Sequence, residues 1–131
     1  MENQETTLME MSAEGRPKPG NPTFTEAWAL VESAKRMAAP LEFAPLEQPE
    51  NRKKLREALR LNWRLWTIFQ AEMTVGENDN LPKEMRENFL NLCNFVDKQT
   101  IDTLNIPTAE KVAALIDINC NIANGLLATA A

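Results

Sequence analysis

The segment from Pro49 to Val75 limits the possible folds most strongly, because it has the pattern of one long helix with a wide apolar arc. Pro49 favours a first helical turn, and Gly76 favours a left-handed stop after the last one. On a helical wheel the arc covers about half of the circumference, whereas packing on one neighbour needs a stripe of roughly 100°. It contains Leu55, Ala58, Leu59, Leu61, Asn62, Leu65, Trp66, Ile68, Phe69 and Met73. This helix must therefore contact more than one neighbour, either other helices of its own bundle or an amphipathic helix of a partner.

A shorter helix is predicted upstream, over residues 23–40. Its first turn has the spacing of a capping box, Thr23 followed by Glu26, and Pro40 is expected to end it. Residues 40–49 contain three prolines, which favours an extended linker. We expect the apolar side chains of this linker to hold it against the helices: Leu41, Phe43 and Leu46.

Two further helices are predicted in the second half of the chain. Residues 80–82, with the sequence Asn-Leu-Pro, open a third helix that ends near Leu104. Thr108 is a good N-cap for a fourth helix, which Gly125 is expected to end. No alternation typical of strands is visible, so the predicted fold is all-α, a small bundle of about four helices.

The domain organisation follows from length and from the proline content of the N-terminal segment. Residues 1–22 are polar and end in a stretch rich in proline and glycine, which predicts a disordered tail. The chain has 131 residues, of which 44% are hydrophobic, enough for one core. Residues 23–131 are therefore predicted to form a single helical domain.

Several residue types that carry chemistry are rare in this chain. It has no histidine and no tyrosine, and its serines are Ser12 and Ser33 alone. Cys93 and Cys120 lack the paired spacing of a zinc or redox site. We therefore expect no enzyme activity, no metal and no cofactor, and free thiols in a reducing cytosol. The first residues lack the pattern of a signal peptide, and no apolar run is long enough to span a bilayer, so we expect a cytoplasmic protein without membrane contact.

Basic residues are concentrated on one edge of the long helix. The segment from Glu50 to Val75 has six basic and three acidic residues, a net charge of +3, so the rest of the chain carries −8 of the total of −5. Four arginines follow one another at a spacing of four residues and form what we call the basic ridge: Arg52, Arg56, Arg60 and Arg64. The ridge can be a solvated face, which we favour, or a surface for phosphates or an acidic partner.

Two asparagines lie in apolar helical stripes, where an unpaired amide is costly. Asn62 lies near the middle of the long helix's arc, and Asn119 lies near the centre of the fourth helix's stripe. We expect structural roles, in which each amide caps a loop backbone or the two meet and set the helix register. Trp66 is predicted to be core, whereas Trp63, at the border of the arc and the ridge, can stack on a guanidinium or anchor a partner.

The order of short fragments in the second half resembles the FlaF family of flagellar biosynthesis regulators, known from alphaproteobacteria. The resemblance covers roughly residues 55–127 and is specific as a series rather than through any single fragment. The fragments that carry it are Asn62 with Leu65 and Trp66, Asn78 or Asn80 with Leu81 and Pro82, residues 115–119, and Gly125 with Leu126. Of these residues, we expect the following to form the structural motif: Asn62, Trp66, Leu81, Pro82, Asn119 and Gly125. Family members commonly have a basic residue after the last asparagine, where this chain has Cys120.

The resemblance implies a cytoplasmic protein that binds flagellin as a secretion chaperone, couples flagellin synthesis to export and acts beside a FlbT-type regulator. The expected cargo is the amphipathic helices at the ends of flagellin. We expect the cargo to contact the outer part of the arc, at Leu61, Trp63, Leu65, Ile68 and Phe69. The alternative is a direct RNA-binding post-transcriptional regulator of flagellin mRNA that uses the basic ridge. The acidity of the whole chain argues against nucleic acid as a partner.

Overall fold

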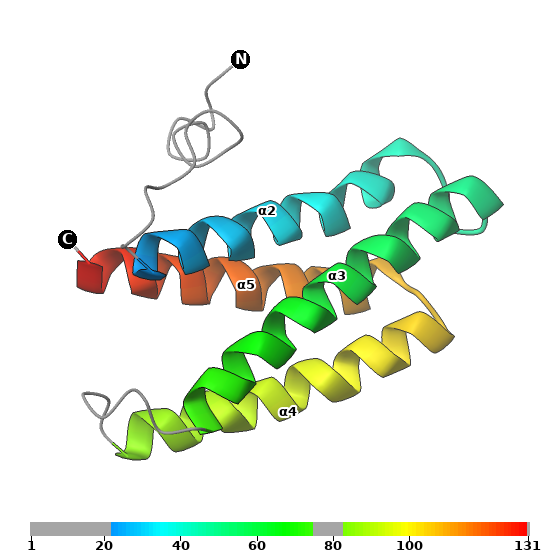
Figure 1. Cartoon of the computed structure of the whole chain (residues 1–131). Coiled ribbons are helices and arrows are strands. Elements are labelled where there is room, and N and C mark those ends of the chain that lie inside the picture. Colours follow the sequence, from blue (N-terminus) through cyan, green and yellow to red (C-terminus); the bar gives the residue numbers. More distant parts are fainter. Residues whose placement is uncertain (1–21, 75–82, 131) are drawn as a thin grey trace.

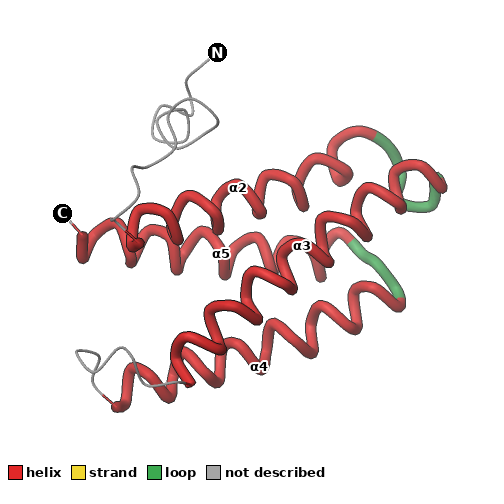
Figure 2. Tube along the Cα trace, in the orientation of Figure 1, coloured by secondary structure: helices red, strands yellow, loops and turns green. Residues whose placement is uncertain are grey.

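The computed structural model describes residues 22–74 and 83–130, and these residues form four helices (Figure 1). The helices are α2 (Pro22–Phe43), α3 (Pro49–Thr74), α4 (Lys83–Asn105) and α5 (Ala109–Ala130). No strand occurs in the described part of the chain, as the tube in Figure 2 also shows. The all-α prediction is therefore confirmed. Within the same residues, none of the helices combines the length and hydropathy needed to cross a bilayer.

Each helix packs against two others. The most extensive contact joins α2 to α5, and the remaining contacts join α2 to α3, α3 to α4, and α4 to α5. Consecutive helices run in opposite directions, so the start of α2 lies beside the end of α5 (Figure 1). Because α3 lies between α2 and α4, it needs a wider apolar surface than a helix with a single neighbour.

The wide arc of α3 is divided between the core and the surface. Its inner part is buried, at most 7% exposed, and consists of Leu55, Ala58, Leu59, Asn62, Trp66 and Phe69. Its outer part remains accessible, with Leu61 38% and Ile68 49% exposed. Burial within the bundle therefore explains most of the arc. Its outer part is an apolar surface that no other described residue covers completely.

The end of α2 differs from the prediction. Pro40 lies inside the helix, which continues to Phe43, so the expected extended linker is replaced by helix over residues 40–43. Asn51 of α3 explains how this last turn is held, because its Nδ2 donates to the carbonyls of Pro40 (2.6 Å) and Ala44 (2.7 Å). These bonds satisfy carbonyls that a helix end otherwise leaves without partners.

The apolar residues of the connection have different surroundings. Leu41 and Leu46 pack against the core as predicted. Phe43 does not, because it is 78% exposed, and the ammonium of Lys54 lies 5.8 Å from the centre of its ring.

The fourth predicted helix begins as expected but continues beyond its expected end. Thr108 caps α5, since its Oγ1 accepts a hydrogen bond from the backbone N–H of Lys111 at 3.2 Å. Gly125 lies inside α5, which continues to Ala130, so the predicted stop at Gly125 is wrong. Leu126 and Leu127 pack against the core, and this burial favours continued helix.

Several predicted features lie outside the described residues. These are the N-terminal tail up to residue 21, the helix stop at Gly76, and the opening of the third helix at Leu81 and Pro82. Pro22, which we placed in the tail, is the first residue of α2, and α4 begins directly after Pro82 and ends at Asn105.

Candidate functional site

A buried hydrogen-bond network joins three helices at the centre of the bundle. The Nδ2 of Asn119 donates to the Oδ1 of Asn62 at 2.7 Å and to the backbone carbonyl of Leu30 at 3.0 Å. The Oδ1 of Asn62 also accepts from the hydroxyl of Ser33 at 2.8 Å, and the Oδ1 of Asn119 accepts from the indole N–H of Trp66 at 2.9 Å. Asn62 and Asn119 are both 0% exposed. Of the two arrangements left open by the sequence, the structure therefore shows the one in which the two amides meet.

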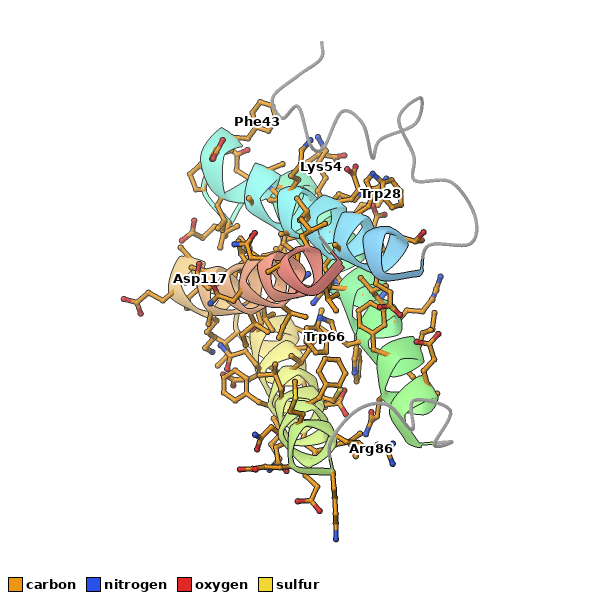
Figure 3. The ribbon with its side chains drawn as sticks, turned by 90° about the vertical axis from the view of Figure 1, so that its left-hand side faces the viewer. Trp28, Phe43, Lys54, Trp66, Arg86 and Asp117 are labelled. Atoms are coloured by element: carbon orange, nitrogen blue, oxygen red, sulfur yellow. The ribbon has the colours of Figure 1, made fainter. Side chains whose placement is uncertain are left out.

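Trp66 connects this network to the aromatic part of the core. Its ring stacks on Phe89 of α4 with 5.6 Å between ring centres, and it meets Phe69 edge to face at 5.9 Å. In Figure 3 Trp66 lies at the middle of the bundle, between α3, α4 and α5. Trp66 is therefore core, as predicted. Phe69 is also a core residue, because its side chain is only 7% exposed. It therefore packs inside the bundle and is not the accessible partner contact that we expected.

An apolar groove lies on the outer surface between α2 and α3, and we call it the α2/α3 groove. Its hollow has a volume of about 300 Å³. From α2 it is lined by Trp28, Ala29, Glu32, Ser33 and Arg36. From α3 it is lined by Leu61, Arg64, Leu65 and Ile68. The structure therefore brings three of the predicted partner residues, Leu61, Leu65 and Ile68, into one surface.

The two other predicted partner residues, Trp63 and Phe69, lie outside this groove. The indole N–H of Trp63 donates to the carboxylate of Asp97 on α4 at 2.8 Å, so Trp63 links α3 to α4 on another side of the helix. A bond of this kind gives Trp63 a structural role, whereas we expected a guanidinium or a partner beside it. Neither Trp63 nor Phe69 lines the α2/α3 groove.

Acidic side chains come together beyond the apolar part of the groove. Glu26 of α2 faces Glu72 of α3, and the two carboxyl groups are close enough to hydrogen bond. Burial first, and then the charge and hydrogen bond of Glu72, raise the pKa of Glu26 from 4.5 to about 7. At neutral pH the carboxyl group of Glu26 is therefore protonated for a large part of the time.

This pair predicts an unusual pH dependence of stability. Between pH 4.5 and about 7 the folded chain keeps a proton on Glu26 that the unfolded chain has lost, so the contribution of Glu26 to stability decreases as pH rises. Glu26→Gln should therefore raise the melting temperature at pH 8 more than at pH 5. Glu57→Gln, at an exposed carboxylate, is the control for general charge effects. An equal change at both pH values for Glu26→Gln would contradict the assignment.

The basic ridge lies on the solvent side of α3. All four of its arginines are exposed. The Nε of Arg52 donates to the carbonyl of Leu46 at 3.3 Å. Arg52 and Arg56 also border a smaller hollow, of about 170 Å³, between α3 and the end of α4. These positions agree with a solvated face and leave the guanidinium of Arg56 accessible to an anion.

Neither thiol has the character of a reactive cysteine. Both cysteines are free, and Cys93 is buried. Burial, with a smaller effect of Asp97, raises the pKa of Cys93 to about 11, and burial together with Asp117 raises the pKa of Cys120. Both thiols are therefore protonated at neutral pH. Within residues 22–74 and 83–130, no group of three or more potential metal-binding side chains comes together.

Sequence reasoning missed three residues that shape these sites. Ser33 joins the buried network and lines the groove, Asn51 caps α2, and Trp28 lines the groove. Asn51 gave a usable signal, because it shares the buried stripe of α3 with Leu55 and Asn62. A polar residue in such a stripe predicts a specific hydrogen-bond partner.

Comparison with known protein families gives a match over most of the chain. The family described as flagellar protein FlaF matches residues 14–126, which is most of the chain. No curated protein and no solved structure matches significantly.

Proposed function

Because the chain belongs to the FlaF family of flagellar proteins, we propose that it binds flagellin in the cytoplasm as a secretion chaperone and couples flagellin synthesis to export. A FlbT-type regulator is the second partner that we propose. Such a function needs a surface that receives an amphipathic helix and needs no reaction chemistry.

The observation that carries this proposal is the α2/α3 groove. A partner helix that enters it buries the apolar side chains that the bundle leaves accessible, above all Leu61 and Ile68. The terminal helices of flagellin are amphipathic and must be kept apart before export, so they are suitable occupants. The inner part of the arc needs no partner, because its side chains, among them Trp66 and Phe69, are already buried in the bundle.

Co-purification tests the proposal directly. An affinity-tagged copy of the full chain is expressed in flagellated cells that carry its own flagellin, and the lysate is treated with nuclease before capture. We expect flagellin to remain bound after the treatment. Loss of flagellin on nuclease treatment would show that RNA joins the two and would support the RNA-binding alternative.

The exposed basic ridge gives a second test of that alternative. We expect Arg56→Glu combined with Arg60→Glu to change flagellin binding little, because both side chains are exposed and do not line the groove. An RNA-binding ridge behaves differently, since log affinity falls with log salt by about 0.7 for each single-strand phosphate contact. The measurement is a titration with flagellin mRNA at several salt concentrations. Salt-dependent binding that the double variant abolishes would favour the RNA-binding function.

A further inference from the structure

The α2/α3 groove has a suitable occupant in the chain itself. We propose that residues 7–14, which precede α2, bind in this groove in the free chain and that a cargo helix displaces them. The displacement rests on the proposed function, whereas the occupation of the groove by residues 7–14 is a property of the free chain and does not depend on the cargo.

The groove combines apolar side chains with a cation that has no ion-pair partner. Leu61 and Ile68 are 38% and 49% exposed, and their spacing of seven residues corresponds to about 10 Å along α3. Among the charged residues of the groove, Arg36 and Glu32 pair at 3.8 Å, whereas Arg64 is exposed and forms no ion pair within the described residues. The groove therefore favours an occupant that has a short apolar face and a carboxylate.

Arg64 lies near the middle of the groove, slightly toward the start of α2. The hydroxyl of Ser33 donates to the Oδ1 of Asn62 at 2.8 Å, so these two residues of α2 and α3 are at the same level. Arg64 follows Asn62 by two residues, about 3 Å along the helix axis. Because α2 and α3 are antiparallel (Figure 1), this step leads toward the start of α2. A segment that enters from the start of α2 can therefore bring a carboxylate to Arg64.

Residues 7–14 have the pattern of such an occupant, within the segment for which the sequence otherwise predicts disorder. They lie outside the described residues and read Thr-Leu-Met-Glu-Met-Ser-Ala-Glu. Thr7 and Glu10 have the spacing of a capping box, and Gly15 favours a helix stop. Leu8 and Met11 are three residues apart, so the pattern places them on one side of a short helix. Two turns of helix are about 11 Å long, which matches the accessible apolar line of α3.

The charge of this segment is complementary to that of the groove. Residues 1–14 have no lysine or arginine and four glutamates, which are Glu2, Glu5, Glu10 and Glu14. Glu10 and Glu14 are one helical turn apart, so either carboxylate can approach Arg64 while the apolar side chains enter the groove. An exposed ion pair adds little affinity by itself. It favours this segment over a neutral or basic one of similar hydropathy.

The connection to α2 is long enough for the segment to reach the groove. Residues 15–21 read Gly-Arg-Pro-Lys-Pro-Gly-Asn, and their prolines favour an extended backbone of about 3.1 Å per residue, or about 22 Å in total. From Pro22 at the start of α2 to Ser33 at the middle of the groove the chain advances eleven residues, about 16 Å along the axis. The connection can therefore turn back along α2 and place residues 7–14 over the groove.

Attachment to the bundle makes a few weak contacts sufficient. A short linker gives the attached segment an effective concentration on the order of 1 mM. Two or three apolar contacts can thus keep the groove occupied for a large part of the time. The apparent affinity for any other ligand then decreases by the fraction of chains whose groove is open. Residues 7–14 would in this way cover the apolar surface of the free chain and raise the affinity that a cargo helix needs.

Paramagnetic broadening in the full-length free chain tests the occupant. A nitroxide is attached to Ala13→Cys, a position on the side of the short helix away from Leu8 and Met11. The chain also carries Cys120→Ser, and Cys93 is buried and stays unlabelled. The spectrum is a nitrogen–proton correlation of the backbone, in which the signals nearest to the nitroxide broaden most.

Two backbone N–H groups at the same level of the bundle serve as probe and control. The probe is Arg36, the lining residue of α2 that lies furthest from Pro22. The control is Ala113, an exposed residue of α5. Asn119 bonds the carbonyl of Leu30; Arg36 follows Leu30 by six residues, and Ala113 precedes Asn119 by six on the antiparallel α5 (Figure 1). The two groups are therefore equally far along the bundle, and only the first lies at the groove.

We expect the signal of Arg36 to be broadened several-fold more than the signal of Ala113. Leu8→Ser combined with Met11→Ser should reduce the broadening at Arg36 to the level of the control. Equal broadening of the two signals in the parent chain would overturn the proposal. Broadening at Arg36 that the double substitution leaves unchanged would also overturn it, because the apolar face would then not be the contact.

The cation of the groove is tested separately. Arg64→Glu should reduce the broadening at Arg36, whereas Arg56→Glu should not, because Arg56 is equally a charged and exposed residue of α3 but lies outside the groove. An equal loss in both variants would overturn the pairing with Arg64. A second copy is recognised by mixing nitrogen-15 chains without nitroxide and unenriched chains with nitroxide. Broadening at Arg36 in this mixture would assign the groove to the segment of another molecule and overturn the proposal.

Titration with purified flagellin separates this inference from the proposed function. The chain with Leu8→Ser and Met11→Ser should bind flagellin several-fold more tightly than the parent chain, because its groove is open. Equal binding by the two chains would overturn displacement by the cargo. If neither chain binds flagellin while Arg36 is still broadened more than Ala113, the proposed function fails and the occupation of the groove by residues 7–14 stands.

Discussion

Asn119→Leu is expected to reduce the free energy of unfolding more than any other single substitution considered for this chain. The substitution leaves the indole N–H of Trp66 without its acceptor, and it removes the bonds to Asn62 and to the carbonyl of Leu30. A buried group left unsatisfied costs about 1–3 kcal/mol. The lost bonds add about 1 kcal/mol each, so the total is a large part of the stability of a small domain.

Asn62→Leu should cost less, although Asn62 is equally buried. The hydroxyl of Ser33 can turn to a carbonyl of its own helix, and Asn119 keeps its bonds to Leu30 and Trp66. The Nδ2 of Asn62 has no partner within the described residues, so its removal costs nothing in hydrogen bonds. Urea unfolding of both variants measures the difference.

The control for these two variants is Asn121→Leu, at an exposed site on α5. Its stability should stay within about 0.5 kcal/mol of the parent chain. An Asn119→Leu variant that unfolds at the same urea concentration as this control, and that fails only in binding flagellin, would contradict the structural role of the network.

Leu61→Ser combined with Ile68→Ser is expected to weaken flagellin binding strongly while the free chain stays folded. Both side chains lie in the α2/α3 groove and are substantially exposed, so the bundle loses little packing when they are shortened. Truncation of a good interface anchor costs on the order of 2 kcal/mol. Each substitution should thus raise the dissociation constant by about 30-fold.

Ile101→Ser is the matched control, because Ile101 is 47% exposed and Ile68 is 49% exposed. Ile101 lies on α4, outside the groove. The measurements are thermal unfolding of each free variant and titration with purified flagellin. If Ile101→Ser weakens binding as much as Ile68→Ser does, the cargo surface is not the groove. If Leu61→Ser and Ile68→Ser unfold the free chain, then Leu61 and Ile68 belong to the core.

Local sequence patterns were sufficient to predict the four helical segments of the described residues. Apolar residues repeat with the helical period in each segment, and Thr108 marks a helix start by its side chain alone. The two asparagines were also informative, since a buried amide has to find a partner. These inferences need only neighbours within a few residues.

The same rules failed where a distant residue determined the outcome. Pro40 is a helix breaker by its own chemistry, but α2 continues through it to Phe43. Asn51 of α3 then satisfies the carbonyls of Pro40 and Ala44 at the helix end. Gly125 is a good helix stop, but α5 continues through it and packs Leu126 on the core. In both places tertiary contacts outweigh a local preference of about 1–3 kcal/mol.

The sequence by itself determined the four helical segments, the wide apolar arc of α3 and the need of Asn62 and Asn119 for partners. Only the tertiary structure decided which part of the arc stays accessible and which groups the amides meet. Ser33 reaches Asn62 across 29 residues, and Asn119 reaches Leu30 across 89. Helical periodicity gives the face of a side chain on its own helix, whereas the direction in which that face points depends on how all the helices pack together.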